Sequence, residues 1–234
     1  MPNLIAPRTL SSLLSLLIVS SVSVFAAEAP APELVARVKR AVVLITTYNA
    51  QGKPDKQGSG FFLTPDRVVT NLHVIDSASL IRISTFTGRK VLVDSVLATD
   101  KASDLALLQL NAPCQDVTTL GLAEVEPRKG EPVIVVSNPL GRRWQVTVGE
   151  VGPIWDFFDM GTRLQITAGV LPGSSGGPVL NFQGRVIGIA AMHTGSADDL
   201  NFAVPAARLK TLQATAQRRL SALRSRDILR FVSA

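Results

Sequence analysis

The chain has 234 residues, of which 46% are hydrophobic, and a formal net charge of +6. This composition indicates a globular protein rather than a disordered one. A single cysteine excludes an intramolecular disulfide framework, and two histidines with one cysteine give no spacing typical of a metal site. We therefore expect neither a metal nor another cofactor.

The first 27 residues have the pattern of a secretory leader. One arginine lies near the start, an apolar and serine-rich run extends from Leu10 to Phe25, and small residues follow. An uncleaved membrane anchor is the alternative, because the run is close to the ~17 residues that a spanning helix needs. We expect residues 1–27 to be a cleaved signal peptide, and the protein to be periplasmic or secreted.

The part after the leader begins with elements that are easily assigned. The run from Pro32 to Ala41 predicts a short helix, and Val42–Tyr48 predicts a strand. Asn49–Gly58 is polar and contains glycine, so we expect a loop there. The remaining length fits one all-β unit or two small barrels.

A candidate base and a candidate acid follow. The apolar run Val68–Ile75 predicts a strand that leads into a turn, with His73 near its end, where a side chain can be held rigidly. Asp104 enters a second apolar run, which ends at Leu110. A carboxylate there is expected to be partly buried and to need a partner such as an imidazole N–H.

Cys114 and the segment Gly152–Gly161 come next. Cys114 lies in a predicted loop and is expected to be an inert thiol, with a redox or intermolecular role as the alternative. The segment is a second predicted loop, and it contains Trp155, Phe157, Phe158 and Met160. We expect these side chains to pack into the core, with contact to a partner or substrate as the alternative.

The glycine-rich segment Gly173–Pro178 contains a candidate nucleophile, Ser175. Glycine lets the backbone turn so that successive N–H groups point at one spot, where the negatively charged oxygen of an intermediate would form. An ordinary glycine-rich turn is the alternative for this segment taken alone. The order His73, Asp104, Ser175 adds a base and an acid, which favours a serine hydrolase.

The same segment fits the G-x-S-x-G nucleophile elbow of α/β-hydrolases. That fold requires the serine first, then the acid and then the histidine. Only His193 follows Ser175, and no Asp or Glu lies between them. The elbow is therefore set aside.

The chain resembles the HtrA (Deg) type of trypsin-like serine protease over nearly its whole length after the leader. The matching motifs are Gly58-Ser59-Gly60-Phe61, Val69-Thr70-Asn71-Leu72-His73-Val74, Asp100 to Leu108, Asn138-Pro139-Leu140-Gly141, Val146-Thr147-Val148-Gly149, Pro172 to Pro178 and Phe202-Ala203-Val204-Pro205. The resemblance implies that residues 28–234 form an all-β domain, a chymotrypsin/trypsin-like double β-barrel with a C-terminal helix. The first barrel would close at Leu110, and the second would open near Pro132.

The resemblance also implies roles for the candidate residues. His73, Asp104 and Ser175 would form a catalytic triad in the cleft between the barrels, and the N–H groups of Gly173 and Ser175 would form the oxyanion hole. Gly169 would lie at the base of the specificity pocket. A glycine there cannot pair with a cationic side chain, so cleavage after Lys or Arg is not expected.

The other pocket residues point to small aliphatic side chains at the cut site. The residues that would bind the substrate, in addition to Gly169, are Val170, Ala190, Ala191 and Met192. His193 would lie near the pocket wall, and we expect no catalytic role for it. An extended or unfolded polypeptide is the expected substrate, because such a cleft binds a strand by backbone pairing.

Three positions depart from the HtrA pattern. Ser137 and Asn201 stand where the family usually has Gly, and Ser174 stands where it usually has Asn. These departures keep an alternative open, namely a protease-like binding or regulatory module with little or no turnover. Ser174 also lacks the carboxylate that a chymotrypsin-type zymogen pairs with its new N-terminus, so that mode of activation is not expected.

The last element, from Pro205 to about Arg224, repeats apolar residues with helical periodicity. Seven Lys or Arg against one acid lie between Arg208 and Arg230. We expect a solvated basic face, with contact to an anionic membrane surface as the alternative and no nucleic acid as partner. No PDZ domain fits in the remaining residues, and the resemblance suggests a homotrimer.

Overall fold

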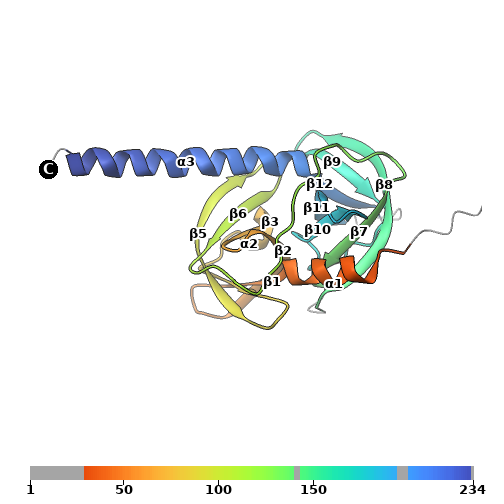
Figure 1. Ribbon diagram of the computed structural model, residues 1–234, viewed down its shortest axis with the longest axis horizontal. Coiled ribbons are helices and arrows are strands. Elements are labelled where there is room, and N and C mark those ends of the chain that lie inside the picture. Colours follow the sequence, from red (N-terminus) through yellow and green to blue (C-terminus); the bar gives the residue numbers. More distant parts are fainter. Residues whose placement is uncertain (1–28, 140–142, 194–199, 233–234) are drawn as a thin grey trace, which may run out of the picture.

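The computed structural model describes residues 29–139, 143–193 and 200–232 (Figure 1). Of residues 192, 193 and 221–232 it describes the backbone only. The described chain forms two closed antiparallel β-barrels and three helices, α1 to α3. The all-β double barrel with a C-terminal helix is therefore confirmed. The predicted leader lies outside the described residues.

The first barrel has the strand order β1-β2-β3-β6-β5-β4. Its strands are β1 (Val42–Tyr48), β2 (Pro54–Thr64), β3 (Arg67–Asn71), β4 (Leu80–Ser84), β5 (Lys90–Asp100) and β6 (Leu105–Leu110). A single helical turn, α2 (Leu72–Ile75), follows β3 directly. As expected, the run that ends at Leu110 belongs to this barrel.

The second barrel has the strand order β10-β11-β12-β9-β8-β7. Its strands are β7 (Pro132–Ser137), β8 (Gln145–Phe157), β9 (Gly161–Ile166), β10 (Pro178–Asn181), β11 (Val186–His193) and β12 (Asn201–Pro205). It opens at Pro132, as the sequence predicts.

Two longer helices lie outside the barrels. The helix α1 (Pro32–Ala41) begins with a proline, whose missing N–H has no partner to lose at that position, and it buries Leu34 and Val38. The helix α3 (Ala206–Val232) starts beside the second barrel, runs across the first and extends beyond it (Figure 1). It ends later than predicted, because no Gly or Pro follows Arg224. No helix among the described residues is long and apolar enough to cross a membrane.

Three clusters of buried side chains make up the core. One fills the first barrel around Ile45 and Phe62, and another fills the second around Val135 and Leu164. The third lies between the barrels and beneath α1 and α3, and it combines residues from both halves. The barrels therefore share a continuous apolar interface, which fixes the facing ends of their strands.

The prediction of a loop at Asn49–Gly58 is wrong for residues 54–58, because β2 begins at Pro54. Tyr48 pairs with Pro54, so polar residues continue the β1–β2 hairpin beyond the barrel. The side-chain oxygen of Asn49 closes the turn by accepting the N–H of Lys53 at 3.0 Å. Pairing with β1 therefore overrides the loop-like composition.

The predicted loop Gly152–Gly161 is also wrong. The strand β8 continues to Phe157 and β9 begins at Gly161, so the segment is a hairpin. Phe157 is half-buried and packs edge-on against Phe202 of β12, with ring centroids 5.5 Å apart. Phe158, at the tip, is fully exposed and Trp155 is 43% exposed, so the packing prediction is wrong for these two residues.

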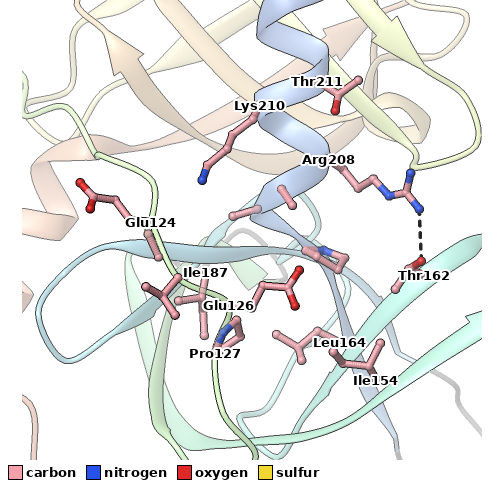
Figure 2. Close-up of a pocket in the computed structure, with 15 residues that line it drawn as sticks. Glu124, Glu126, Pro127, Ile154, Thr162, Leu164, Ile187, Arg208, Lys210 and Thr211 are labelled. Atoms are coloured by element: carbon pink, nitrogen blue, oxygen red, sulfur yellow. Dashed lines mark hydrogen bonds between the residues drawn. The ribbon is translucent and has the colours of Figure 1, made fainter.

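A pocket of about 320 Å³ lies where α3 leaves the second barrel (Figure 2). The first turns of α3 form one side with Arg208 and Lys210, and the segment before β7 forms another with Glu124 and Glu126. Arg208 donates a hydrogen bond to the hydroxyl of Thr162 at 3.2 Å. The pocket contains none of the candidate catalytic residues.

Candidate active site

The pairing of β3 with β6 brings His73 and Asp104 together. In the antiparallel register Asn71 lies opposite Leu105, so Leu72 comes level with Asp104. One residue later the turn of α2 directs His73 towards the carboxylate. Two strands that are distant in sequence thus place a base and an acid side by side.

Two hydrogen bonds join the pair. Nδ1 of His73 lies 2.6 Å from one carboxylate oxygen of Asp104, and the backbone N–H of His73 donates to the other oxygen at 2.9 Å. The Asp104 side chain is 26% exposed and that of His73 is 51% exposed. The carboxylate is therefore partly buried, as predicted, while the imidazole remains accessible.

The backbone of Asp104 is itself held firmly. Its φ is +57°, in the left-handed region that few residues other than glycine, asparagine and aspartate enter. Its carbonyl accepts the backbone N–H of Leu72 at 3.0 Å and the side-chain amide of Asn71 at 2.9 Å. Asn71 is fully buried, and its hydrogen bond fixes the backbone of Asp104.

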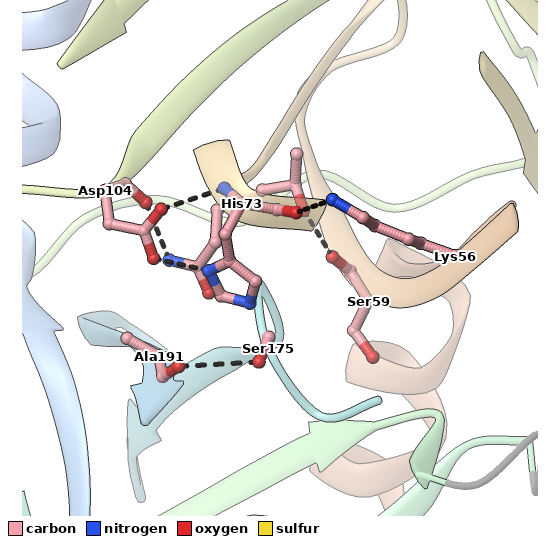
Figure 3. Close-up of polar contacts among 8 residues, drawn as sticks. Lys56, Ser59, His73, Asp104, Ser175 and Ala191 are labelled. Atoms are coloured by element: carbon pink, nitrogen blue, oxygen red, sulfur yellow. Dashed lines mark hydrogen bonds and ion pairs between the residues drawn. The ribbon is translucent and has the colours of Figure 1, made fainter. Parts of the chain in front are cut away.

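Ser175 lies where the second barrel meets the first, since its carbonyl accepts the N–H of Ser59 of β2 at 2.8 Å. Figure 3 shows the imidazole of His73 between Asp104 and Ser175. The hydroxyl of Ser175 donates to the carbonyl of Ala191 at 3.4 Å, a long and weak bond. The structure therefore brings the three predicted residues together, with the serine hydroxyl held by β11 rather than by the imidazole.

The segment before Ser175 forms a tight turn. The N–H of Ser174 donates to the carbonyl of Leu171 at 2.8 Å, and Gly173 has a φ of +92°. A proline at the second position and a positive φ at the third define a type II turn. Gly173 is thus required by its conformation.

The N–H groups of Gly173 and Ser175 are free donors. Among the residues that the structure describes, neither group has a protein acceptor. The carbonyl of Ser174 accepts the N–H of Gly177 at 2.9 Å, which turns the next N–H, that of Ser175, to the opposite side of its trans peptide. Both donors remain available to an oxygen of a bound molecule.

Ser59 of β2 connects the loop that carries the predicted nucleophile, residues 171–177 (the nucleophile loop), to the first barrel. Its N–H donates to the carbonyl of Ser175 and its hydroxyl donates to the carbonyl of Gly173, both at 2.8 Å. The same hydroxyl accepts the N–H of Asn138 at 2.8 Å. Gly176 lies so close that a Cβ there would come within 2.1 Å of the Ser59 carbonyl oxygen.

Sequence reasoning gave no role to Ser59, Asn71 or Lys56. Lys56 donates to the carbonyl of His73 at 3.3 Å (Figure 3). It also donates to the carbonyl of Asp76 at 3.3 Å, at the end of α2. Ser59 and Asn71 stand inside matching motifs, but their partners are distant in the chain. A polar residue within an apolar strand was the available signal, because a buried polar group needs a hydrogen-bond partner.

The three departures from the HtrA pattern all make hydrogen bonds around this loop. The hydroxyl of Ser137 donates to that of Ser174 at 3.0 Å, and the Ser174 oxygen also accepts the N–H of Leu171 at 3.2 Å. The side-chain oxygen of Asn201 accepts the N–H of Val170 at 3.1 Å. These side chains support the loop rather than distort it.

The predicted pocket residues are neighbours along the second barrel. Val170 and Ala190 are buried, and Ala191 is half-buried beside Ser175. A Cβ at Gly169 would meet only the methyl group of Thr147 at 3.9 Å, so open space adjoins this glycine. The side chains of Met192 and His193 lie outside the described part of the chain.

A buried cation lies near the acid. Arg163 of β9 is only 4% exposed, and it donates to the carbonyl of Thr162 at 3.0 Å. Burial lowers the pKa of Arg163, and the negative charge of Asp104 acts in the opposite direction. An arginine side chain keeps its charge at neutral pH in proteins, so Arg163 is a buried cation. The second barrel thus contributes positive potential to the acid of the first.

The double barrel and the arrangement of His73, Asp104 and Ser175 are features of a known class of protein. Residues 58–189 match the family described as a trypsin-like peptidase domain, and the chain belongs to that family. The chain is 34% identical over 166 residues to the serine protease HhoB of Synechocystis sp., covering 67% of this chain and 39% of that protein.

The chain is also similar to a second curated relative and to a solved structure. A DegP-like periplasmic serine endoprotease of Chlamydia pneumoniae is 34% identical over 167 residues, or 66% of this chain and 33% of that protein. The crystal structure of a serine endoprotease from Yersinia pestis superposes with a TM-score of 0.69 at 26% identity, covering 82% of this chain and 68% of that one. The HtrA-type resemblance is confirmed. The chain spans less than half the length of the two curated relatives.

Proposed function

We propose that the protein is a serine endopeptidase that cleaves extended or unfolded polypeptides. The observation that carries the proposal is the pair of hydrogen bonds from His73 to Asp104, with Ser175 beside the imidazole. One carboxylate fixes both the ring and the backbone of the base. An inert glycine-rich turn has no need of such an arrangement.

In this proposal Ser175 is the nucleophile and His73 the general base. The serine hydroxyl leaves the carbonyl of Ala191 and donates to Nε2 of His73, which takes its proton as the oxygen attacks the scissile carbonyl. Asp104 keeps Nδ1 protonated and stabilises the imidazolium. The ring then returns the proton to the leaving amine, and water hydrolyses the acyl-enzyme by the reverse roles.

The N–H groups of Gly173 and Ser175 would stabilise the oxyanion of the tetrahedral intermediate. They are free of protein acceptors within the described residues, and the type II turn keeps them in place. The chemistry needs no metal or other cofactor. Gly169, Val170, Ala190, Ala191 and Met192 would form a pocket for small aliphatic side chains.

We also propose that the protein is exported, that residues 28–234 form its protease domain, and that it acts in envelope protein quality control. The periplasmic name of the Chlamydia relative and the leader-like residues 1–27 support the location. The same name, an endoprotease, supports polypeptide substrates. The homotrimer is proposed from the HtrA-type resemblance alone. Contact of the basic face of α3 with an anionic membrane is the weaker alternative for this helix.

Labelling by a fluorophosphonate probe, together with hydrolysis of unfolded casein, tests the proposal. Wild type should react and cleave, and Ser175→Ala and His73→Ala should lose about 10⁶ in kcat, the loss seen when such groups are removed from another serine protease. Thermal unfolding of all three proteins checks that they are folded.

A folded wild type that neither labels nor cleaves would contradict the proposal. It would favour the alternative, a protease-like binding or regulatory module. Cleavage that persists in Ser175→Ala would instead show that another residue, or a contaminant, is responsible.

A further inference from the structure

We propose that Ser137 and Ser174 form a positioning pair that holds the two oxyanion donors in place. The inference rests on the proposed function and deepens it. Neither hydroxyl touches the substrate in the proposed reaction. Their effect would pass through the backbone of the nucleophile loop.

The hydroxyls of Ser137 and Ser174 are both buried. Ser137 is the last residue of β7 and is 4% exposed, and Ser174 is 1% exposed. The hydroxyl of Ser137 donates to that of Ser174 at 3.0 Å. A buried hydrogen bond between side chains 37 residues apart fixes the distance between their backbones, because no water can replace either partner.

Ser174 lies between Gly173 and Ser175, whose N–H groups are the two oxyanion donors. Its own N–H, carbonyl and hydroxyl all make hydrogen bonds. Its N–H donates to the Leu171 carbonyl at 2.8 Å, and its carbonyl accepts from Gly177 at 2.9 Å. Its hydroxyl oxygen accepts the N–H of Leu171 at 3.2 Å in addition to the hydroxyl of Ser137. Since Gly173 and Ser175 are its direct neighbours, a shift of Ser174 moves both oxyanion donors together.

The end of β7 holds the loop a second time through Asn138. The N–H of Asn138 donates to the Ser59 hydroxyl, which in turn donates to the carbonyl of Gly173, both at 2.8 Å. The last residue of β7 and the residue after it thus anchor adjacent residues of the loop, Ser137 directly and Asn138 through Ser59. Ser137 provides the shorter of these two routes.

The kinetic signature follows from where the donors act. Oxyanion donors stabilise the transition state more than the ground state, so their displacement lowers kcat and leaves KM nearly unchanged. Displacement costs less than outright loss of a donor, which is typically ~10²–10³ in kcat. We expect Ser137→Ala and Ser174→Ala each to lower kcat by roughly tenfold with KM within about twofold.

A double-mutant cycle on the full chain tests the pair. If the hydroxyls act through each other, Ser137→Ala in the Ser174→Ala background should have almost no further effect on kcat. Ser84→Ala is the matched control, because Ser84 is a buried serine of β4 away from the loop, and it should keep wild-type kcat. A parallel cycle in urea measures the same coupling from unfolding midpoints and does not depend on turnover.

The two cycles separate the possible failures. Wild-type kcat in both single variants, or losses that multiply in the double variant, would overturn the pairing even if the protein is an active protease. Additive shifts of the urea midpoint would overturn it even if no turnover is found. A wild type without fluorophosphonate labelling but with coupled urea midpoints would contradict the proposed function and leave the buried pair supported.

Discussion

The two halves of the candidate site are built differently. On the first barrel, His73 and Asp104 are fixed by their own barrel, through the pairing of β3 with β6 and the left-handed backbone at Asp104. On the second barrel, the loop that carries Ser175 is held by side-chain hydroxyls, and one of them, that of Ser59, comes from the first barrel.

This difference indicates where the site is sensitive. The acid and base depend on backbone pairing, which is hard to disturb without unfolding the barrel. The nucleophile loop depends on a few buried hydroxyls, each of which can be removed by one substitution. Changes to His73 and Asp104 should alter the chemistry itself, whereas changes around the loop, including those at Ser59, should alter the placement of Ser175.

The largest effect that separates the halves is expected from Asp104→Asn. Asparagine tolerates the left-handed backbone, so the fold should persist. Without the carboxylate, His73 loses the partner that sets its tautomer, and kcat should fall by about 10⁴, as found for the corresponding change in another protease. Peptide hydrolysis measures the loss, and circular dichroism controls for folding. A variant within tenfold of wild type would mean that Asp104 is not the orienting acid.

A smaller loss is expected from Ser59→Ala, which removes the donor to the Gly173 carbonyl and the acceptor for the Asn138 N–H. The loop should loosen while the His73–Asp104 pair stays intact, lowering kcat by about 10- to 100-fold. Steady-state kinetics of Ser59→Ala, with Ser84→Ala as the control, measure the change in kcat. Unchanged kcat in Ser59→Ala would show that the Ser59 hydroxyl is not needed to position the loop.

The smallest effect concerns acid stability of the first barrel. Hydrogen bonds from the side chains of Thr64 and Gln109 lower the pKa of Asp66 from its ordinary value. Its contribution to the free energy of unfolding is therefore present above the unfolded-state pKa of about 3.8 and is lost as pH falls through the lower folded-state value.

Urea unfolding of wild type and Asp66→Asn at about pH 7 and about pH 3 measures this contribution. The variant should lose less stability on acidification than wild type does. Asp94→Asn, at an exposed carboxylate of β5, is the control. An identical pH dependence in wild type and Asp66→Asn would contradict the expectation.

Much of the architecture could be predicted from local sequence. The helix α1 and the strand β1 begin and end as expected, because a proline start and an apolar β-branched run act within a few residues. The candidate residues His73, Asp104 and Ser175 could also be named, since each lies in a short motif. The structure brings their side chains together (Figure 3).

The remainder depends on partners that a local pattern does not contain. The hydroxyl of Ser59 and the carbonyl of Gly173 are 114 residues apart, and no periodicity links them. The hairpin at Gly152–Gly161 forms because β9 pairs with β8, which composition alone does not reveal. In the same way, the exposure of Phe158 follows from the place of the turn rather than from its hydrophobicity.

The hydrogen bonds from Ser59 to the carbonyls of Gly173 and Ser175 also have a consequence during folding of the new chain. A chain in which only the second barrel has formed contains Ser175 but has neither the base nor the hydroxyl that fastens the Gly173 carbonyl. In the proposed function, such a partly folded chain would not cleave other chains or itself. Ser175 would become reactive only after the two barrels have docked, so the end of folding and the onset of activity would coincide.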